Sequence, residues 1–299
     1  MRRRLAALLL VCLLLTGCAA NTAPAVTAAP TATPAPSPSP ASTAPPHPYE
    51  PLRGYFDALR TDRGCVRNGV AYLAVETVCA YYDLACSWQS EGGSLTLRLP
   101  GLTVEGERGR EWLTAGGRYL YLPEGWIEAD GRLYLPADVI EHLFGLPVTL
   151  AEDLSLAEVG STGCRLLQAE EDYYVRTTQA DDLYWLIHII YAEAHHESLA
   201  GQIGVGNVVL NRVANDEFPA TIMAVVLDRE HTIQFTPVGT GAVTAEPDEK
   251  ATIAAYLCLE GFNTAGDALY FVNPVRGDAS WFVSDLTKVC TIGNHVFYK

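Results

Sequence analysis

The chain has 299 residues, with 20 Lys or Arg against 35 Asp or Glu, so its formal net charge at pH 7 is −15. Because neutralising nucleic-acid phosphates requires clustered basic side chains, this acidic chain excludes a nucleic-acid partner. Apolar residues make up 49% of the sequence, which excludes a wholly disordered chain. The length suggests about two domains of ~150 residues each.

The first 18 residues have the pattern of an export signal. Arg2, Arg3 and Arg4 precede an apolar run, residues 5–15, that is too short to span a membrane. The run leads into a Leu-Thr-Gly-Cys sequence ending at Cys18, which resembles a bacterial lipobox. The resemblance implies that Cys18 is acylated and becomes the mature N-terminus, so that a lipid anchors the protein to the cell membrane. The alternative is an ordinary secretory signal cleaved after Ala20.

Residues 19–50 are predicted to be a linker. Nine of the 18 prolines fall between Pro24 and Pro48, among Ala, Thr and Ser. This composition buries too little apolar surface to fold and favours an extended chain. Beyond Cys18, six cysteines remain, and an even number permits disulfides in an exported protein. Sequence leaves their pairing open, with Cys258 and Cys290 as one candidate pair.

Residues 51–160 contain a weak internal repeat with a spacing of 62 residues. A turn at Gly69 and another at Gly131 each precede a short predicted strand and helix. The second unit contains Tyr134-Leu135-Pro136, and the first has Ala74 where the proline would stand.

These features resemble the copper amine oxidase N-terminal-like domain, with its turn glycine, Tyr-Leu/Val-Pro motif and helix. The resemblance implies a small α+β module, which we interpret as a spacer or a wall-binding module. It implies no copper, because residues 65–158 contain no cluster of histidines.

Helical periodicity begins at residue 181. Leu186, Ile189 and Ile190 form one apolar stripe, and Glu193 falls on the same stripe. Burial of a carboxyl group raises its pKa. A carboxyl that stays protonated near neutral pH can act as a general acid on a glycosidic oxygen. The alternative is a solvated or salt-bridged structural glutamate near the helix end.

A series of motifs surrounds Glu193 and continues to the C-terminus. In order they are residues 190–194 (IYAEA), 201–213 (GQIGVGNVVLNRV), 218–219 (FP), 234–235 (QF), 268–274 (ALYFVNP) and 292–298 (IGNHVFY). In this order and spacing, residues 181–299 resemble the catalytic domain of SleB-type cell wall hydrolases, the spore cortex-lytic enzyme family. The chain departs from the family at His195-His196, where relatives usually carry Arg-Gly.

The resemblance implies a mostly helical, lysozyme- or transglycosylase-like domain with a small β-hairpin region, and the whole chain is therefore expected to be α+β. It also implies that Glu193 protonates the oxygen that joins N-acetylmuramic acid to N-acetylglucosamine. Because no second carboxylate stands out, we predict a lytic transglycosylase that uses the sugar's own 6-hydroxyl as nucleophile. The alternatives are a hydrolytic muramidase or glucosaminidase on the same fold and a non-catalytic wall-binding lipoprotein. Four acidic residues are unranked candidates for a second carboxylate: Glu197, Asp216, Glu246 and Asp278.

Aromatic and polar side chains in the same motifs are candidates for binding the substrate. They are Gln234, Phe235, Tyr270, Asn273, Trp281 and His295. Aromatic faces and amides suit sugar rings and N-acetyl groups, although a core strand ending in an Asn-Pro turn explains Tyr270 and Asn273 equally well. For His295, a structural role is at least as good an interpretation. Asn211 and Arg212 are expected to anchor a loop.

A metal-dependent peptidase or amidase is the main alternative enzyme. Its candidate ligands are His188, Glu193, His195 and His196. The HExxH motif is absent, and the five-residue spacing from His188 to Glu193 turns these side chains about 140° apart on a helix. We therefore expect no metal and no cofactor. The predicted protein is a monomer outside the cytoplasm, with peptidoglycan glycan strands and, through its lipid, the membrane as partners. Spore cortex and vegetative wall both remain open as substrates.

Overall fold

The computed structural model describes residues 52–55, 63–161, 163–169, 180–228, 242–274 and 285–299. The lipid-attachment candidate Cys18, the predicted linker and the sugar-binding candidates Gln234, Phe235 and Trp281 lie outside the described residues. Within the described ranges, no helix combines the length and the apolar character that crossing a membrane requires.

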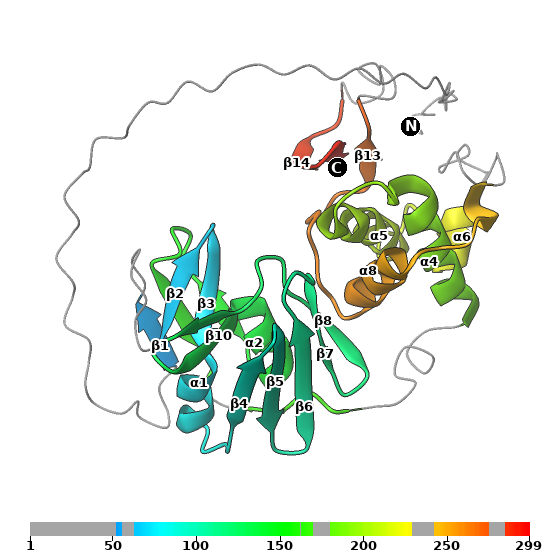
Figure 1. The fold of residues 1–299 in the computed structure, drawn as a ribbon. Helices are drawn as coiled ribbons and strands as arrows, with labels where there is room; N and C mark the ends of the chain where they lie inside the picture. The colour runs from blue at the N-terminus through cyan, green and yellow to red at the C-terminus, as the bar shows by residue number, and fades with distance from the viewer. Residues whose placement is uncertain (1–51, 56–62, 162, 170–179, 229–241, 275–284) are drawn as a thin grey trace, which may run out of the picture.

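The described residues of the N-terminal part form antiparallel strands and two short helices (Figure 1). Its elements are β1 (Leu52–Tyr55), β2 (Gly64–Arg67), β3 (Val70–Ala74), α1 (Val75–Tyr81), β4 (Ser87–Glu91), β5 (Ser94–Leu99), β6 (Leu102–Glu107), β7 (Trp112–Ala115), β8 (Arg118–Tyr121), β9 (Ile127–Ala129), β10 (Arg132–Pro136), α2 (Ala137–Phe144), β11 (Val148–Leu150) and β12 (Leu156–Val159). The strands pair in the orders β1-β12-β11, β2-β3-β10-β9 and β4-β5-β6-β7-β8.

The repeat predicted from the sequence corresponds to two matching turn–strand–helix units. Asn68 and Asp130 have φ values of 50° and 52° at the turns that lead into β3 and β10. These left-handed angles followed by a glycine are typical of tight hairpin turns. The two repeated strands pair with each other, with Leu73 opposite Leu135, so the units are related by an approximate twofold axis at this pair.

The five-stranded sheet has one apolar and one polar face. Side chains such as Leu97, Val104 and Leu113 are fully buried on the inner face. Thr103 and Glu105 alternate with them and are exposed on the outer face. This alternation is what a half-buried antiparallel sheet requires, so the pattern fixes which face packs against the core.

The C-terminal part is mostly helical, with a three-stranded sheet in the order β13-β15-β14. Its elements are α4 (Ala180–Ala194), α5 (Leu199–Val213), α6 (Ile222–Leu227), the 3₁₀ turn η1 (Ala242–Thr244), α8 (Glu249–Leu259), β13 (Tyr270–Val272), β14 (Lys288–Ile292) and β15 (His295–Tyr298). Ser198, Thr221 and Asp248 cap α5, α6 and α8, because their side-chain oxygens accept hydrogen bonds from the first turn of each helix.

Glycines in α5 allow close packing at the centre of this domain. A Cβ added at Gly204 would lie 2.7 Å from Phe297 Cζ. A Cβ at Gly206 would lie 2.6 Å from Cys258 Sγ. Helical glycine costs about 1 kcal/mol relative to alanine, so the tight contact of α5 with α8 and β15 offsets that cost.

All six cysteines after Cys18 are free thiols in the structure. Cys258 Sγ donates to Ile203 O at 3.3 Å, whereas Cys290 Sγ points to Thr264 O at 3.8 Å. The proposed pairing of Cys258 with Cys290 is therefore wrong. Burial raises the pKa of the Cys258 thiol, so this side chain behaves as a small core residue.

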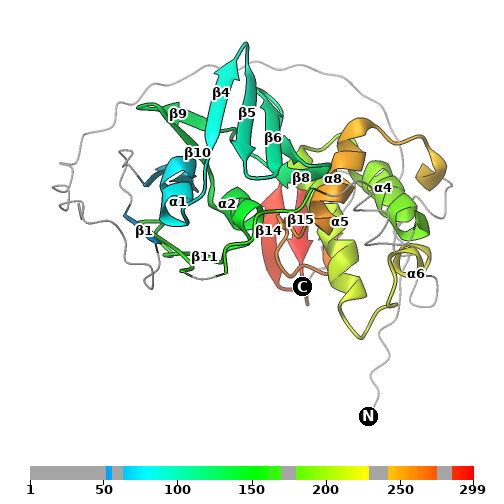
Figure 2. The same ribbon diagram turned by 90° about the horizontal axis from the view of Figure 1, so that it is seen from below.

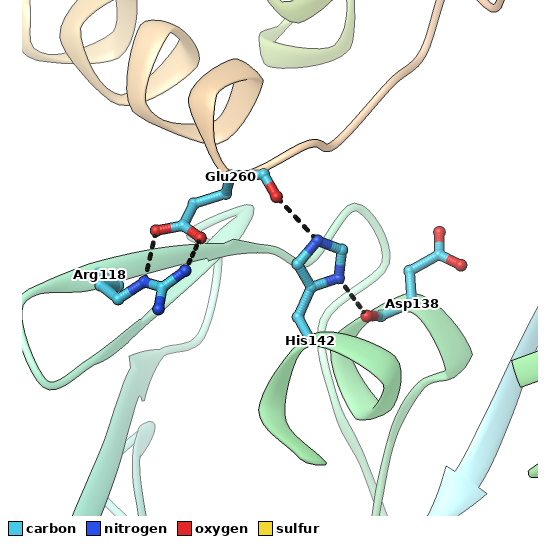
Figure 3. Close-up of polar contacts among 4 residues, drawn as sticks. All are labelled: Arg118, Asp138, His142 and Glu260. Atoms are coloured by element: carbon cyan, nitrogen blue, oxygen red, sulfur yellow. Dashed lines mark hydrogen bonds and ion pairs between the residues drawn. The ribbon is translucent and has the colours of Figure 1, made fainter. Parts of the chain in front are cut away.

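The two parts of the chain are held together by a polar joint (Figure 3). Arg118 on β8 makes two hydrogen bonds to Glu260, at 2.9 and 2.6 Å. The Glu260 side chain is 0% exposed. The ring nitrogens of His142 lie 2.7 Å from Asp138 O and 3.0 Å from Glu260 O.

Aromatic rings extend the same joint. Tyr119 stacks on Tyr256 with ring centroids 5.2 Å apart, and His142 stacks on Phe262 at 4.1 Å. One buried apolar cluster includes residues of both parts, from Leu143 in α2 to Leu257 in α8. The N-terminal part, called the sheet module, and the helices of the C-terminal part therefore pack side by side as one body (Figures 1 and 2).

Candidate active site

Glu193 lies in the last turn of α4. Leu186, Ile189 and Ile190 on the same stripe are 0% exposed, which confirms the apolar face predicted from the sequence. Glu193 itself is half-buried. Its side chain therefore lies at the boundary of the core.

The buried side chain of Arg212, on α5, is the main charged neighbour of this site. It is 4% exposed, and its Nε donates to Leu269 O at 2.8 Å. Its guanidinium lies over the rings of Phe218 and Tyr270, 5.1 and 5.4 Å from their centroids. These contacts fix the guanidinium between α5 and β13.

Burial lowers the pKa of Arg212 to about 10, while electrostatic interactions with Tyr270, Asp228 and Glu193 oppose this shift. At neutral pH Arg212 therefore remains a cation within electrostatic range of Glu193. Glu193 therefore has a buried cation within electrostatic range in addition to its apolar neighbours on α4. Proximity to a cation favours the ionised form of a carboxyl, the opposite effect to burial.

Asp228, the residue after α6, is a member of this site that the sequence interpretation missed. It is 9% exposed, and its charge acts on Arg212 together with that of Glu193. The sequence does contain one signal, because Arg212 interrupts the apolar spacing of α5 and a buried guanidinium requires carboxylate or carbonyl partners. The position of Asp228 in three dimensions has no local sequence signature.

Glu197 is buried and acts as a structural residue. Its carboxylate accepts hydrogen bonds from the Asn294 backbone N and from Asn294 Nδ2, both at 3.1 Å. Lys250 Nζ donates to Glu197 O at 2.8 Å. The turn between β14 and β15 therefore closes onto the end of α4, which leaves Glu197 poorly suited to be a second catalytic carboxylate.

The other candidates for a second carboxylate are either exposed or outside the described residues. Asp216 and Glu246 are both exposed, in the connections that follow α5 and η1. Asp278 lies outside the described residues.

The histidines near Glu193 contact backbone carbonyls. Nδ1 of the buried His188 lies 2.9 Å from Val243 O, and Nδ1 of His195 lies 2.9 Å from Tyr191 O. His196 is exposed beside His195. Across the described ranges, no group of three or more His, Cys, Asp or Glu side chains is arranged to hold a metal ion.

A family comparison identifies the region that carries these side chains. Residues 196–298 match the family model described as Cell Wall Hydrolase. The region is named the cell wall hydrolase domain after this similarity. The match begins just after Glu193 and includes Arg212, Asp228 and Tyr270.

Curated relatives of the cell wall hydrolase domain are spore cortex-lytic enzymes. The Oceanobacillus iheyensis enzyme is 32% identical over 119 residues, which is 40% of this chain and 42% of the relative. The Bacillus subtilis enzyme is 29% identical over 117 residues, 39% of this chain and 37% of the relative. The chain thus spans about two fifths of the length of these relatives.

The solved structures similar to the chain include the catalytic domain of the germination-specific lytic transglycosylase SleB from Bacillus anthracis. It is 30% identical, with a TM-score of 0.38, over 41% of this chain and 97% of that one. The catalytic domain of the Bacillus cereus SleB protein is 31% identical, with a TM-score of 0.36, over 40% of this chain and 90% of that one.

The remaining predicted site residues of the cell wall hydrolase domain occupy two different environments. Tyr270 is half-buried on β13 beside Arg212, and Asn273 follows the same strand, also half-buried. His295 is only 3% exposed, with its ring 5.2 Å from that of Phe271. The enclosed position of His295 favours a structural role over direct contact with sugar.

The predicted loop anchor in this domain is confirmed. Asn211 Nδ2 donates to Gly266 O and Ala268 O at 2.8 and 2.9 Å, and Arg212 holds Leu269. Two neighbouring side chains at the end of α5 thus fix the segment that leads into β13 and orient Tyr270.

Proposed function

We propose that this chain is a peptidoglycan-degrading enzyme in which Glu193 cleaves the bond between N-acetylmuramic acid and N-acetylglucosamine as a lytic transglycosylase. The observation that carries the proposal is a half-buried glutamate within electrostatic range of Arg212, whose fixed guanidinium lies over the ring of Tyr270. The cell wall hydrolase match and the spore cortex-lytic relatives support peptidoglycan as the substrate.

One glutamate suffices for the proposed chemistry. The Glu193 carboxyl donates its proton to the bridging oxygen as the glycosidic bond breaks and positive charge develops on the sugar ring. The resulting carboxylate then takes the proton of the muramic acid 6-hydroxyl, whose oxygen attacks the anomeric carbon. The product is a 1,6-anhydromuramyl end, and the carboxyl is restored.

Arg212 contributes by stabilising the carboxylate that exists after the first proton transfer. A buried guanidinium in fixed position acts without reorganisation during the reaction. Asp228 shares that guanidinium, so its negative charge limits the effect of Arg212 on the resting carboxyl. Tyr270 and Asn273 are proposed to contact the sugar and its N-acetyl group, together with Gln234, Phe235 and Trp281.

Hydrolysis is the second candidate reaction, because Asp228 provides a carboxylate near the same guanidinium as Glu193. A two-carboxylate glycosidase uses its second carboxylate as a nucleophile or to activate water. The products distinguish the reactions, since hydrolysis leaves reducing ends and transglycosylation leaves anhydro ends.

The test is release of muropeptides from purified peptidoglycan, analysed by mass spectrometry for spore cortex and vegetative wall separately. Glu193→Gln keeps the shape of the side chain and removes the transferable proton, so the rate should fall by about 10²–10⁴-fold. Glu217→Gln, at an exposed position after α5, is the matched control and should retain full activity. Muropeptide release by Glu193→Gln at the rate of the unsubstituted protein would overturn the assignment of Glu193.

The proposal places the enzyme outside the cytoplasm, attached to the membrane through Cys18 and acting as a monomer. Labelling with palmitate in cells tests the anchor, because the label should be lost in Cys18→Ser. Label that persists in that variant would show attachment elsewhere.

A further inference from the structure

The outer face of the five-stranded sheet carries a transverse row of polar side chains. Thr96 on β5 lies opposite Glu105 on β6, and Glu105 lies opposite Thr114 on β7. Thr114 in turn lies opposite Tyr119 on β8, the residue that stacks on Tyr256 of the cell wall hydrolase domain. The row therefore runs across the sheet and ends at the joint between the two parts of the chain.

A groove of about 270 Å³ lies on this face. Hydroxyl groups of Ser94, Thr96 and Thr114 line it, with the carboxylates of Glu105 and Glu107. Arg110 and the half-buried indole of Trp112 complete the polar and aromatic lining.

Contacts within the wall of the groove hold its charged and aromatic groups in place. Arg110 Nε lies 2.7 Å from Glu107 Oε2, and its guanidinium lies 5.2 Å from the centroid of the Trp112 ring. Hydroxyls and carboxylates bind sugar hydroxyl and amide groups, an indole packs against the apolar face of a sugar ring, and a guanidinium binds carboxylates. Peptidoglycan glycan strands carry all of these groups.

The turn between β6 and β7 connects the groove to the cell wall hydrolase domain. Arg110 Nη1 lies 3.7 Å from Glu249 Oε1 in the first turn of α8. The neighbouring Glu111 accepts a hydrogen bond from the backbone N–H of Leu199 at the start of α5, and burial raises the pKa of its carboxyl. Lys250, which follows Glu249, donates to the carbonyl of Glu197 in the loop after α4.

We propose that this groove is a second binding surface for the glycan strand of peptidoglycan, held in fixed position relative to Glu193 by the joint. The proposal rests on the proposed function, because the glycan strand is the substrate named there. The lining supplies the groups that a sugar chain requires. Arg110 in the wall of the groove contacts Glu249 on α8, and the next residue, Lys250, contacts Glu197 in the loop after α4. The module thus binds the polymer beyond the bond that is cleaved.

The test uses the full chain carrying Glu193→Gln, so that binding is measured without turnover. Sedimentation with purified cell wall sacculi gives the dissociation constant. Adding Glu105→Ala or Trp112→Leu should weaken binding about tenfold, the effect of losing one charge-assisted hydrogen bond or aromatic contact. Thr103→Ala, an exposed change on the same strand and face but outside the groove, should alter binding less than about twofold.

Unchanged binding in both groove variants would overturn the proposal. If Trp112→Leu does not fold, the surface pair Thr96→Ala and Glu105→Ala decides the question, because neither side chain is in the core. If the groove substitutions weaken binding but the chain with Glu193 intact releases no muropeptides, this surface is supported and the proposed cleavage is overturned. If the chain with Glu193 intact releases muropeptides but the groove substitutions leave binding unchanged, the proposed cleavage is supported and this surface is overturned.

Discussion

At the scale of single residues, the charge of Arg212 is the feature that most directly shapes the chemistry of Glu193. A half-buried carboxyl in apolar surroundings would be stabilised in its neutral form, whereas a neighbouring guanidinium stabilises the ionised form. In the proposed mechanism Glu193 must carry a proton, and the nearby cation favours the release of that proton.

Replacing Arg212 by Met should lower kcat by at least about tenfold, because the carboxylate formed during proton transfer loses a fixed opposite charge. Without the cation, the carboxyl should hold its proton to higher pH, so the alkaline limb of the pH–rate profile should move upward. Steady-state rates on soluble glycan fragments measure both effects.

Arg212→Lys is the control, since it keeps the charge but loses the planar group that donates to Leu269. It should keep the alkaline limb near its original pH. An unshifted limb in Arg212→Met would contradict the electrostatic role of this residue.

At the scale of secondary structure, the glycines of α5 decide how closely this helix packs. Gly206 faces Cys258 on α8 and Ile190 on α4. A Cβ added at Gly206 would lie 2.6 Å from Cys258 Sγ and 2.9 Å from Ile190 Cδ1. The position therefore sets the distance between α5 and α4, the helix that carries Glu193.

Gly206→Ala should destabilise the protein by about 1–3 kcal/mol, because overpacking outweighs the gain of ~1 kcal/mol in helix propensity. Chemical denaturation measures the free energy of unfolding. Adding Cys258→Ala removes one colliding atom, so the double variant should recover part of the loss. A stabilised Gly206→Ala protein would show that α5 has room that the structure does not indicate.

At the scale of the whole molecule, the sheet module and the helical domain share a core and a buried ion pair. The side chains of Arg118 and Glu260 are 15% and 0% exposed, so their ion pair is largely shielded from solvent. Removing one partner leaves an uncompensated buried charge, which typically costs more than the pair contributes.

Arg118→Met should therefore lower the free energy of unfolding by about 3–5 kcal/mol, and Arg118→Met with Glu260→Gln should lower it less. Thermal unfolding of the parent should show a single transition, since the largest buried apolar cluster includes residues of both parts. Lys299→Met, which breaks the exposed pair with Asp267, should cost at most about 1 kcal/mol. Two well-separated transitions in the parent would contradict a rigid joint.

The sequence by itself determined the local elements of this protein. Turns at Asn68-Gly69 and Asp130-Gly131 and the apolar stripe of α4 depend on backbone preference and periodicity within a few residues. The motifs around Glu193 also pointed to the cell wall hydrolase domain that the comparison found.

Only the tertiary structure decided which distant groups meet. Glu197 binds Asn294, 97 residues away, and Arg118 binds Glu260, 142 residues away. The same folding brings Asp228 near Arg212, keeps Cys258 apart from Cys290, and places the groove of the module beside α8. These contacts follow from how whole elements pack, and periodicity and turn chemistry over a few residues carry no information about that packing.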